Sequence, residues 1–178
     1  IQRLTIAPEG FYVILKNPAL VGDGGTRALK HPDRAGKSNS KQASLTVGRK
    51  VNVTGPSDFP LWPGQMAQVV KGHHLRSNQY LLGRVYDEQA AQENIGDAVL
   101  VEQTDDTTVV KSLIPGKDEL TTGKLFIIKG TDASFFIPPT GIEVVPGDDG
   151  EFVRDAETLE VLEYCILLGE NGNKDFRV

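Results

Sequence analysis

The sequence predicts an all-β protein made of tandem, small antiparallel β-sheet repeat domains. Two observations lead to this prediction: aromatic and aliphatic runs of strand length alternate with turns rich in Pro and Gly, and similar runs recur along the 178-residue chain. Three of the runs contain Tyr12, Tyr80 and Tyr164, which are 68 and 84 residues apart. Spacings that long and uneven indicate tandem domains with loop insertions rather than a tight solenoid.

A second pair of segments recurs between these runs. Phe-Pro-Leu-Trp-Pro-Gly at residues 59–64 leads to a strand with Val69, and Phe-Phe-Ile-Pro-Pro at 135–139 leads to a strand with Val144, 75 residues later. The repetition divides the chain into a first domain at residues 1–72, a second at 73–156, and the truncated start of a third repeat at 157–178.

In the first domain, a strand from Leu4 is followed by a Pro8-Glu9-Gly10 turn and a strand from Phe11, because Pro and Gly stand where such a turn favours them. Asn17-Pro18 ends that strand, since proline cannot donate to a β-ladder. Period-2 alternation around residues 48–50 predicts a hairpin between Leu45–Val47 and Val51–Val53. Residues 54–58 are expected to form a loop, and residues 65–70 a strand.

In the second domain, a strand over residues 79–86 leads into residues 87–94, which are expected to form the one short helix. The remaining predicted strands are apolar runs between turn residues, and they cover residues 98–103, 107–114, 125–130, 135–138 and 142–145. Toward the C-terminus, strands are expected at 152–154, 158–168 and from residue 176.

Residues 22–42 form the one basic stretch of low hydrophobicity, with cationic side chains among Gly, Ser and Asn. Such a composition is typical of a solvated loop, or of an arm that becomes ordered when it meets a neighbouring subunit. The second interpretation makes four cationic residues candidates for an interface: Arg27, Lys30, Arg34 and Lys37.

Four aromatic residues are candidates for packing or for an interface: Trp62, Phe59, Phe135 and Phe136. Prolines on both sides of Trp62 exclude a central strand and predict an edge or connecting segment. We expect Trp62 to anchor this segment on a sheet face, where its ring would bury a large apolar area. The alternative is a proline–aromatic surface that recognises a partner.

The residue pattern offers little for catalysis or metal binding. Adjacent strand residues point to opposite faces, so His73 and His74 are poorly placed to chelate one ion. The acidic pairs 105–106 and 148–149 lack the spaced ligands of a calcium loop and are interpreted as solvated turns. Cys165 lies in an apolar run, as a buried structural thiol does. No phosphate-binding loop, nucleophile elbow or zinc-protease motif is present, so neither an enzyme nor a cofactor is predicted.

Composition narrows the classes of partner. The net charge is −5, without the concentrated basic face of nucleic-acid-binding domains, so no direct nucleic-acid partner is predicted. No apolar run approaches the roughly 18 residues that span a bilayer, and no secretory leader is visible, so neither a membrane protein nor secretion is predicted. The single cysteine fits a reducing compartment.

The order of these motifs resembles the repeats of the major vault protein family. The resemblance begins with Pro8, Tyr12 and Asn17-Pro18, continues with the Phe-Pro-Leu-Trp-Pro-Gly segment, and includes the strand at 80–86 with its acidic turn. The family carries a similar Phe-Pro-Leu-Tyr-Pro-Gly segment. Residues 122–127 are similar to its Gly-Glu-Glu-Trp-Leu segment, residues 135–145 to its Tyr-Ile-Pro and Glu-Val-Val segments, and residues 163–178 to the opening of another repeat.

Two departures stand out: Phe126 replaces the tryptophan of the family segment, and the 22–42 stretch is longer and more basic. The resemblance implies antiparallel β repeats stacked into rods that pack side by side in a shell wall. It therefore predicts a structural protein of the cytoplasm or of a virion, whose partners are copies of itself and other shell components. The alternative is a non-catalytic module that binds a partner protein or glycan.

Overall fold

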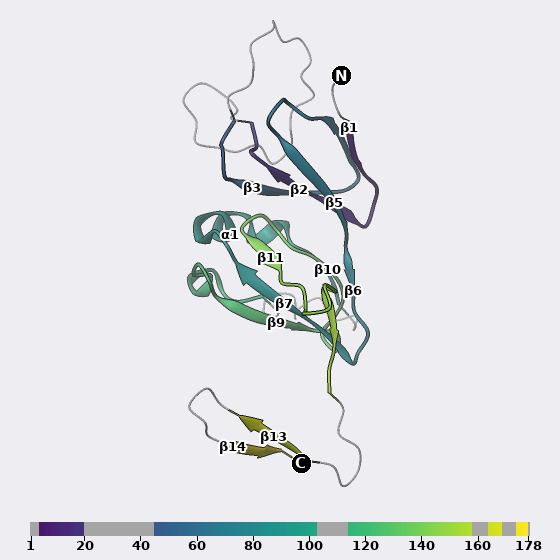
Figure 1. Ribbon diagram of the computed structural model, residues 1–178, viewed down its shortest axis with the longest axis vertical. Coiled ribbons are helices and arrows are strands. Elements are labelled where there is room, and N and C mark those ends of the chain that lie inside the picture. The colour runs from purple at the N-terminus through teal and green to yellow at the C-terminus, as the bar shows by residue number, and fades with distance from the viewer. Residues whose placement is uncertain (1–3, 20–44, 103–113, 158–163, 169–173, 178) are drawn as a thin grey trace, which may run out of the picture.

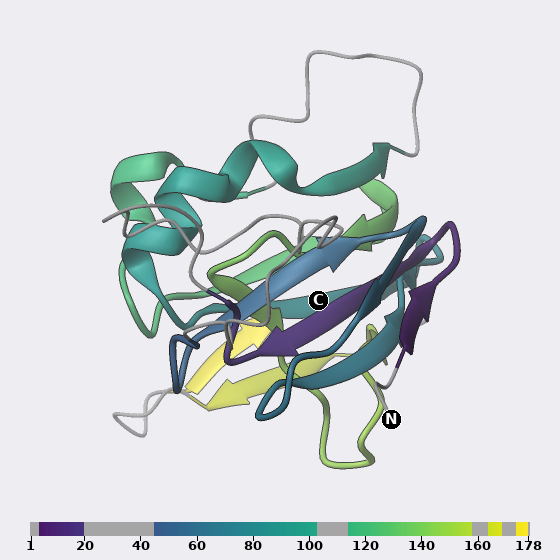
Figure 2. The same ribbon diagram turned by 90° about the horizontal axis from the view of Figure 1, so that it is seen from above.

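The computed structural model describes residues 4–19, 45–102, 114–157, 164–168 and 174–177. Two β-sheet units follow one another along the long axis of the molecule, and a C-terminal hairpin lies beyond the second unit (Figure 1). Seen from above, the strands of the first unit lie over those of the second (Figure 2). The predicted all-β fold of small antiparallel sheets is confirmed.

The first unit, residues 4–72, contains five strands among its described residues, 4–19 and 45–72. Three form a sheet in the order β3-β2-β5, and two form a separate ladder, β1-β4. Alternate side chains point between the sheet and the ladder, where Val13, Leu15 and Phe59 belong to one buried cluster. The strands are β1 (Leu4–Ala7), β2 (Phe11–Lys16), β3 (Lys50–Thr54), β4 (Ser57–Pro60) and β5 (Met66–Lys71).

The second unit, residues 73–156, has β7 at its centre. One edge of β7 pairs with β9, and the other pairs with β11 and then β12, while β6, β10 and β8 form a second sheet. Leu81, Ile128 and Phe136 are fully buried between these layers. The strands are β6 (His73–His74), β7 (Gln79–Val85), β8 (Val99–Glu102), β9 (Leu125–Lys129), β10 (Ala133–Ile137), β11 (Ile142–Val144) and β12 (Val153–Asp155).

The predicted short helix is present as α1 (Glu88–Asn94), followed by the 3-10 turn η1 (Ile95–Asp97). A carboxylate oxygen of Asp87 accepts a hydrogen bond from the backbone N–H of Ala90 at 3.0 Å, which caps the first turn. Ala90 and Ala91 are the buried residues of the helix, so its small apolar face is what packs on the unit. A second 3-10 turn, η2 (Lys117–Glu119), precedes β9.

The two units share one pattern of strand pairing. Their ladders β1-β4 and β6-β10 correspond, and their sheets β3-β2-β5 and β9-β7-β11 correspond in order and direction. The registers agree as well: Leu15 pairs with Val51 and Ala67, as Gly83, 68 residues later, pairs with Phe126 and Val144. In the ladders, Thr5 opposes Phe59 as His73 opposes Phe136.

The turns of the two units agree in detail. Gly64 and Gly141 both precede the edge strand of their sheet, with φ of 95° and 97°, a region that favours glycine. The backbone N–H of Gly55 donates to Phe11 at 2.8 Å, and that of Gly130 donates to Gln79 at 2.7 Å. Equivalent positions in the first and second units can therefore be assigned residue by residue.

Two local predictions were wrong. Leu45–Val47 is not a strand of a hairpin, because β3 pairs with β2 instead, and Leu45 makes only an isolated bridge with Ala19. Ser57–Pro60, whose first residues were expected in a loop, is the edge strand β4. In both cases the pairing partner is distant in sequence, so local alternation did not indicate it.

The C-terminal hairpin consists of β13 (Cys165–Leu168) and β14 (Lys174–Arg177), which pair antiparallel. Parts of the strands predicted at 107–114 and 158–168 lie outside the described residues. Among the described residues, no helix is long and apolar enough to cross a membrane.

Candidate functional site

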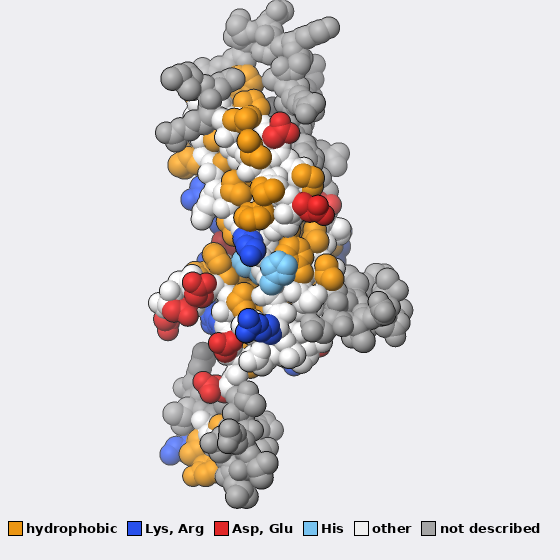
Figure 3. All heavy atoms as spheres, turned by 90° about the vertical axis from the view of Figure 1, so that its right-hand side faces the viewer, with side chains coloured by type: hydrophobic (Ala, Val, Ile, Leu, Met, Phe, Trp, Pro, Cys, Tyr) orange, Lys and Arg blue, Asp and Glu red, His pale blue; other side chains and the backbone are white. Residues whose placement is uncertain are grey.

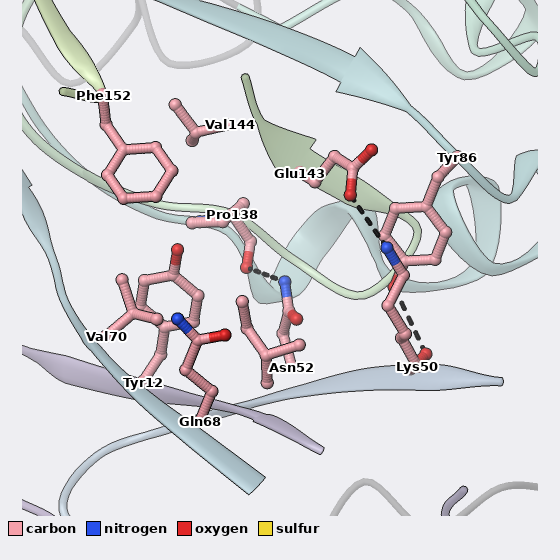
Figure 4. Close-up of a pocket in the computed structure, with 11 residues that line it drawn as sticks. Tyr12, Lys50, Asn52, Gln68, Val70, Tyr86, Pro138, Glu143, Val144 and Phe152 are labelled. Carbon is pink, nitrogen blue, oxygen red and sulfur yellow. Dashed lines mark hydrogen bonds and ion pairs between the residues drawn. The ribbon is translucent and has the colours of Figure 1, made fainter. Parts of the chain in front are cut away.

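Among the described residues, buried and part-buried polar contacts gather at the junction between the two units. Here the outer face of the β3-β2-β5 sheet meets β11 and the segment that joins β10 to β11 (Figure 4). The apolar part of the junction is a buried cluster of Tyr12, Val70 and Ile137, with Phe135 and Phe152 packed against it. The junction therefore contains a small core to which both units contribute.

Asn52 joins the two units through its backbone and its side chain. Its backbone N–H donates to Thr140 Oγ1 at 2.9 Å. Its side-chain Nδ2 donates to the carbonyl oxygens of Pro138 and Pro139 at 3.0 and 3.2 Å, and lies 3.3 Å from that of Ile142. The two prolines lie between β10 and β11, outside both strands. An asparagine at this point of β3 fixes the position of the second unit relative to the first.

An ion pair lies at the edge of the junction. Lys50 Nζ is 2.8 Å from Glu143 Oε2, and Arg84 donates to Glu143 Oε1 at 2.6 Å. Lys50 Nζ also lies 4.2 Å from the centre of the Tyr86 ring, a cation–π distance. Partial burial disfavours the charged form of Glu143, but the hydrogen bonds from Lys50 and Arg84 outweigh it and hold the pKa of this carboxyl below its usual value.

Tyr86 completes this side of the junction. Its hydroxyl donates to the backbone carbonyl of Lys50 at 3.2 Å and accepts from the N–H of Gly141 at 3.1 Å. Burial raises the pKa of Tyr86 to about 12, so the phenol stays protonated at neutral pH and keeps its donor. One side chain of the second unit thus binds the backbone of both units.

A histidine and a tyrosine meet in the middle of the junction. The hydroxyl of Tyr12 and Nε2 of His73 are 3.2 Å apart, and the His73 ring contacts Phe152 edge-on with centroids 5.0 Å apart. Burial lowers the pKa of His73 to about 4 and raises that of Tyr12, so both side chains are neutral at pH 7. Neutral partners suit a site that is closed to solvent.

A pocket of about 170 Å³ remains between the units (Figure 4). This volume is below the roughly 300 Å³ at which pockets for drug-sized ligands begin. Its polar lining includes Lys50 and Asn52 of the first unit and Glu143 of the second. Each of these side chains already binds the opposite unit. The arrangement holds two domains in one orientation, and it offers no side chain poised as a nucleophile. In the part of the chain that the structure describes, no three His, Cys, Asp or Glu residues group together as metal ligands do.

The predicted candidates are distributed over three places. Phe59 and Phe136 are buried in the cores of their units. Phe135 is partly buried near the junction, with its ring 4.7 Å from that of His74. Trp62 is only partly buried, in the turn where Gln65 binds its backbone, and it does not belong to a core cluster of the described residues. Trp62 is therefore partly and not fully buried, and its role as a packing anchor stays a prediction. The four cationic candidates, Arg27, Lys30, Arg34 and Lys37, lie outside the described residues.

The junction residues Asn52, Lys50, Glu143 and Tyr86 were not predicted. Each looks like an ordinary solvated strand residue in the sequence, and only contacts over 36 to 93 residues bring them together. A comparison of equivalent positions in the two units is the signal that could have found them.

The chain was compared with known proteins at the level of sequence. No protein-family model matches it, and no curated protein is significantly similar to it.

Proposed function

We propose that this chain is a structural protein, a repeat segment of a self-assembling shell, and that its two units are copies of one vault-like β repeat. The observation that carries the proposal is the agreement in strand register: every ladder of the first unit has a counterpart in the second with equivalent pairs. Units that share one architecture and are joined by a fixed contact build rods, as stacked repeats do.

The junction supports a structural role. It contains a buried apolar cluster, an ion pair and several hydrogen bonds between the units, more than a flexible linker between independent domains would need. A wall that carries load requires such fixed orientations. In the proposed shell, of the cytoplasm or of a virion, the partners of the chain are copies of itself.

The side of the rod offers a surface for lateral contacts. Hydrophobic side chains gather on the face formed by β1, β5 and β6 (Figure 3). On β1, Leu4 and Ile6 point away from the core and are 61% and 60% exposed. Among the described residues, β4 is the one strand that pairs with β1, so β1 presents both apolar side chains and an edge to which no described strand is bonded.

The segment that contains Trp62 favours one second candidate, a non-catalytic binding module. Trp62 is partly exposed beside the exposed Pro63, which is the combination that proline–aromatic recognition surfaces use. In that case the exposed apolar residues bind a partner protein or glycan rather than another copy of the chain.

Sedimentation velocity from about 1 to 100 μM, followed by negative-stain microscopy, separates the two functions. The structural function predicts particles larger than the 19.3 kDa chain that grow with concentration and show rods or sheets. A chain that remains monomeric over the whole range contradicts the shell and favours the binding module. A variant with Leu4→Ser and Ile6→Ser tests the lateral face, and Val47→Ser, an 83% exposed apolar residue in a turn, is the matched control.

A further inference from the structure

The equivalence of the two units predicts where a further junction would form. In the existing junction, the first unit contributes Lys50 and Asn52 from β3. Since β9 pairs with β7 as β3 pairs with β2, the equivalent residues of the second unit are Leu125 and Ile127. Both point away from the core of their unit and are 52% and 54% exposed. A junction-forming face is therefore repeated on the second unit, without a neighbour on it among the described residues.

The equivalent face of the second unit is more apolar than that of the first. Leu125 and Ile127 stand where the first unit has a lysine and an asparagine. Leu82 and Val145 occupy the positions equivalent to Ile14 and Gln68. These four aliphatic side chains cannot bind the polar partners that Lys50 and Asn52 bind, and Arg84, which lies opposite Leu125 on the same face, is already paired with Glu143. Whatever covers this face must be apolar at the matching points.

The first unit carries a surface with that property. In the existing junction, the second unit contributes Glu143 and the segment Pro138–Thr140. Because β5 and its preceding turn correspond to β11 and its preceding turn, the equivalent residues of the first unit are Met66 and the segment Leu61–Pro63. Met66 is 58% exposed, and Trp62 is partly exposed beside it.

Both residues of the ion pair are thus replaced by apolar residues at the equivalent positions. Where the existing junction joins Lys50 to Glu143 at 2.8 Å, the equivalent pair is Leu125 and Met66. Within one chain Leu125 and Met66 lie on different units and both are exposed, so they do not meet as Lys50 and Glu143 do. Two copies of the chain can.

We infer that the outer face of β9 and β7 in one copy binds the Leu61–Met66 segment of a second copy, head to tail, in the geometry of the internal junction. The inference rests on the proposed function, because it names one contact of the self-assembly. The contact is heterologous, since the two surfaces differ, and among the described residues of each copy one surface of each kind is exposed. It therefore extends rods end to end, whereas the β1 face serves contacts between rods.

A pair of charged variants tests this contact. Leu125→Lys and Met66→Glu restore, on opposite surfaces, the two charges of the internal pair. Each variant alone should lose end-to-end association by on the order of 100-fold in the dissociation constant, because a lone charge is then buried against an apolar surface. Both positions are exposed, so the variants should fold, which circular dichroism checks.

Mixing the two variants should restore association, because the lysine introduced by Leu125→Lys in one copy then meets the glutamate introduced by Met66→Glu in the other. In the mixture the copies alternate, and association weakens with salt while that of the wild-type chain does not. Sedimentation velocity at 50 and 500 mM NaCl measures both effects. Val47→Lys, at an exposed position outside either surface, is the control that should leave association unchanged.

Four outcomes would overturn the inference. If both variants assemble as the wild-type chain does, this contact is excluded and the proposed function stands. If the wild-type chain is monomeric throughout, both the contact and the proposed function are excluded. If Leu125→Lys abolishes association and Met66→Glu does not, the β9 face binds its own copy rather than the Leu61–Met66 segment. If Leu125→Lys instead lowers the free energy of unfolding of a monomer, the C-terminal hairpin covers the face within one chain.

Discussion

At the scale of single residues, Asn52 has the largest set of contacts between the units. One side-chain amide donates to two proline carbonyls of the other unit and approaches a third carbonyl. Pro138 and Pro139 lie outside the strands, so the amide supplies their carbonyls with hydrogen bonds that the β-ladder does not.

Asn52→Ala should therefore lower the free energy of unfolding by about 1–3 kcal/mol, since it removes the donor to the partly buried Pro138 carbonyl, whereas the Pro139 carbonyl keeps its bond from the Ile142 N–H. Urea denaturation followed by fluorescence measures the change. Asn52→Asp should cost more, because it places a carboxylate against the same carbonyl oxygens. Gln68→Ala, an exposed amide on the same sheet face, is the control. A change of less than about 0.5 kcal/mol for Asn52→Ala would show that water replaces the amide at no cost.

His73 gives the junction a pH dependence of definite sign. Its pKa is about 4 in the folded protein, because burial disfavours the imidazolium, against about 6.5 in the unfolded chain. Between these values the unfolded state binds more protons than the folded state. The stability from the neutral imidazole is thus fully present above pH 6.5 and is lost as the pH falls toward 4, by about 3 kcal/mol at most.

Unfolding free energies measured at pH 7, 6, 5.5 and 5 test this prediction, because most carboxylates stay ionised over that range. Stability should fall with acid in the wild-type chain and fall less in His73→Phe, which keeps a ring of similar shape next to Phe152. His74→Phe is the matched control on the exposed side of the same strand, and it should keep the wild-type slope. Equal slopes in all three proteins would exclude His73 as the titrating group.

At the scale of elements, tight turns set the registers that the two units share. Gly130 follows β9 and donates to the carbonyl of Gln79, and a Cβ at this position would overlap the backbone of Arg76. Gly55 has the equivalent bond to Phe11 and is equally enclosed by backbone. A glycine directly after β3 in the first unit, and directly after β9 in the second, is thus a steric requirement of this architecture.

Gly130→Ala should destabilise the protein by about 1–3 kcal/mol, because the surrounding backbone must move to admit the methyl group. Thermal and urea unfolding measure this cost. Gly96→Ala is the control, since the space around Gly96 in η1 is open and alanine is favoured in helical turns. If both substitutions have the same effect, the close backbone approach at Gly130 is not a constraint on the fold.

At the scale of the whole molecule, the junction couples the folding of the two units. The buried cluster at Tyr12, Val70 and Ile137 draws residues from both units, so neither can unfold without exposing apolar surface of the other. We expect one cooperative transition rather than two.

Differential scanning calorimetry tests the coupling. The wild-type chain should give a single peak, whereas the double variant Lys50→Ala, Asn52→Ala should split it or broaden it, because it removes the polar contacts that orient the units. The equivalent double variant of the second unit, Leu125→Ala, Ile127→Ala, should leave the monomer peak single, since both residues are exposed. Two peaks in the wild-type chain would show that the units fold independently.

The class of fold and the approximate place of most strands could be predicted from local features of the chain. Strand-length apolar runs and Pro/Gly turns are such features, and the helix at 88–94 follows from a local cap at Asp87. The spacing of Tyr12 and Tyr80 also equals the offset that relates the central strands of the two units. These features are readable because each depends on neighbours in the chain.

The pairing of strands and the meeting of polar residues depend instead on how distant segments pack. The hairpin expected at Leu45–Val47 gave way to pairing of β2 with β3, since buried Val13 and Val53 gain more by lying side by side in one core. The Lys50–Glu143 pair joins residues 93 positions apart. This contact depends on how two sheets pack against each other, so the local sequence around either residue does not predict it.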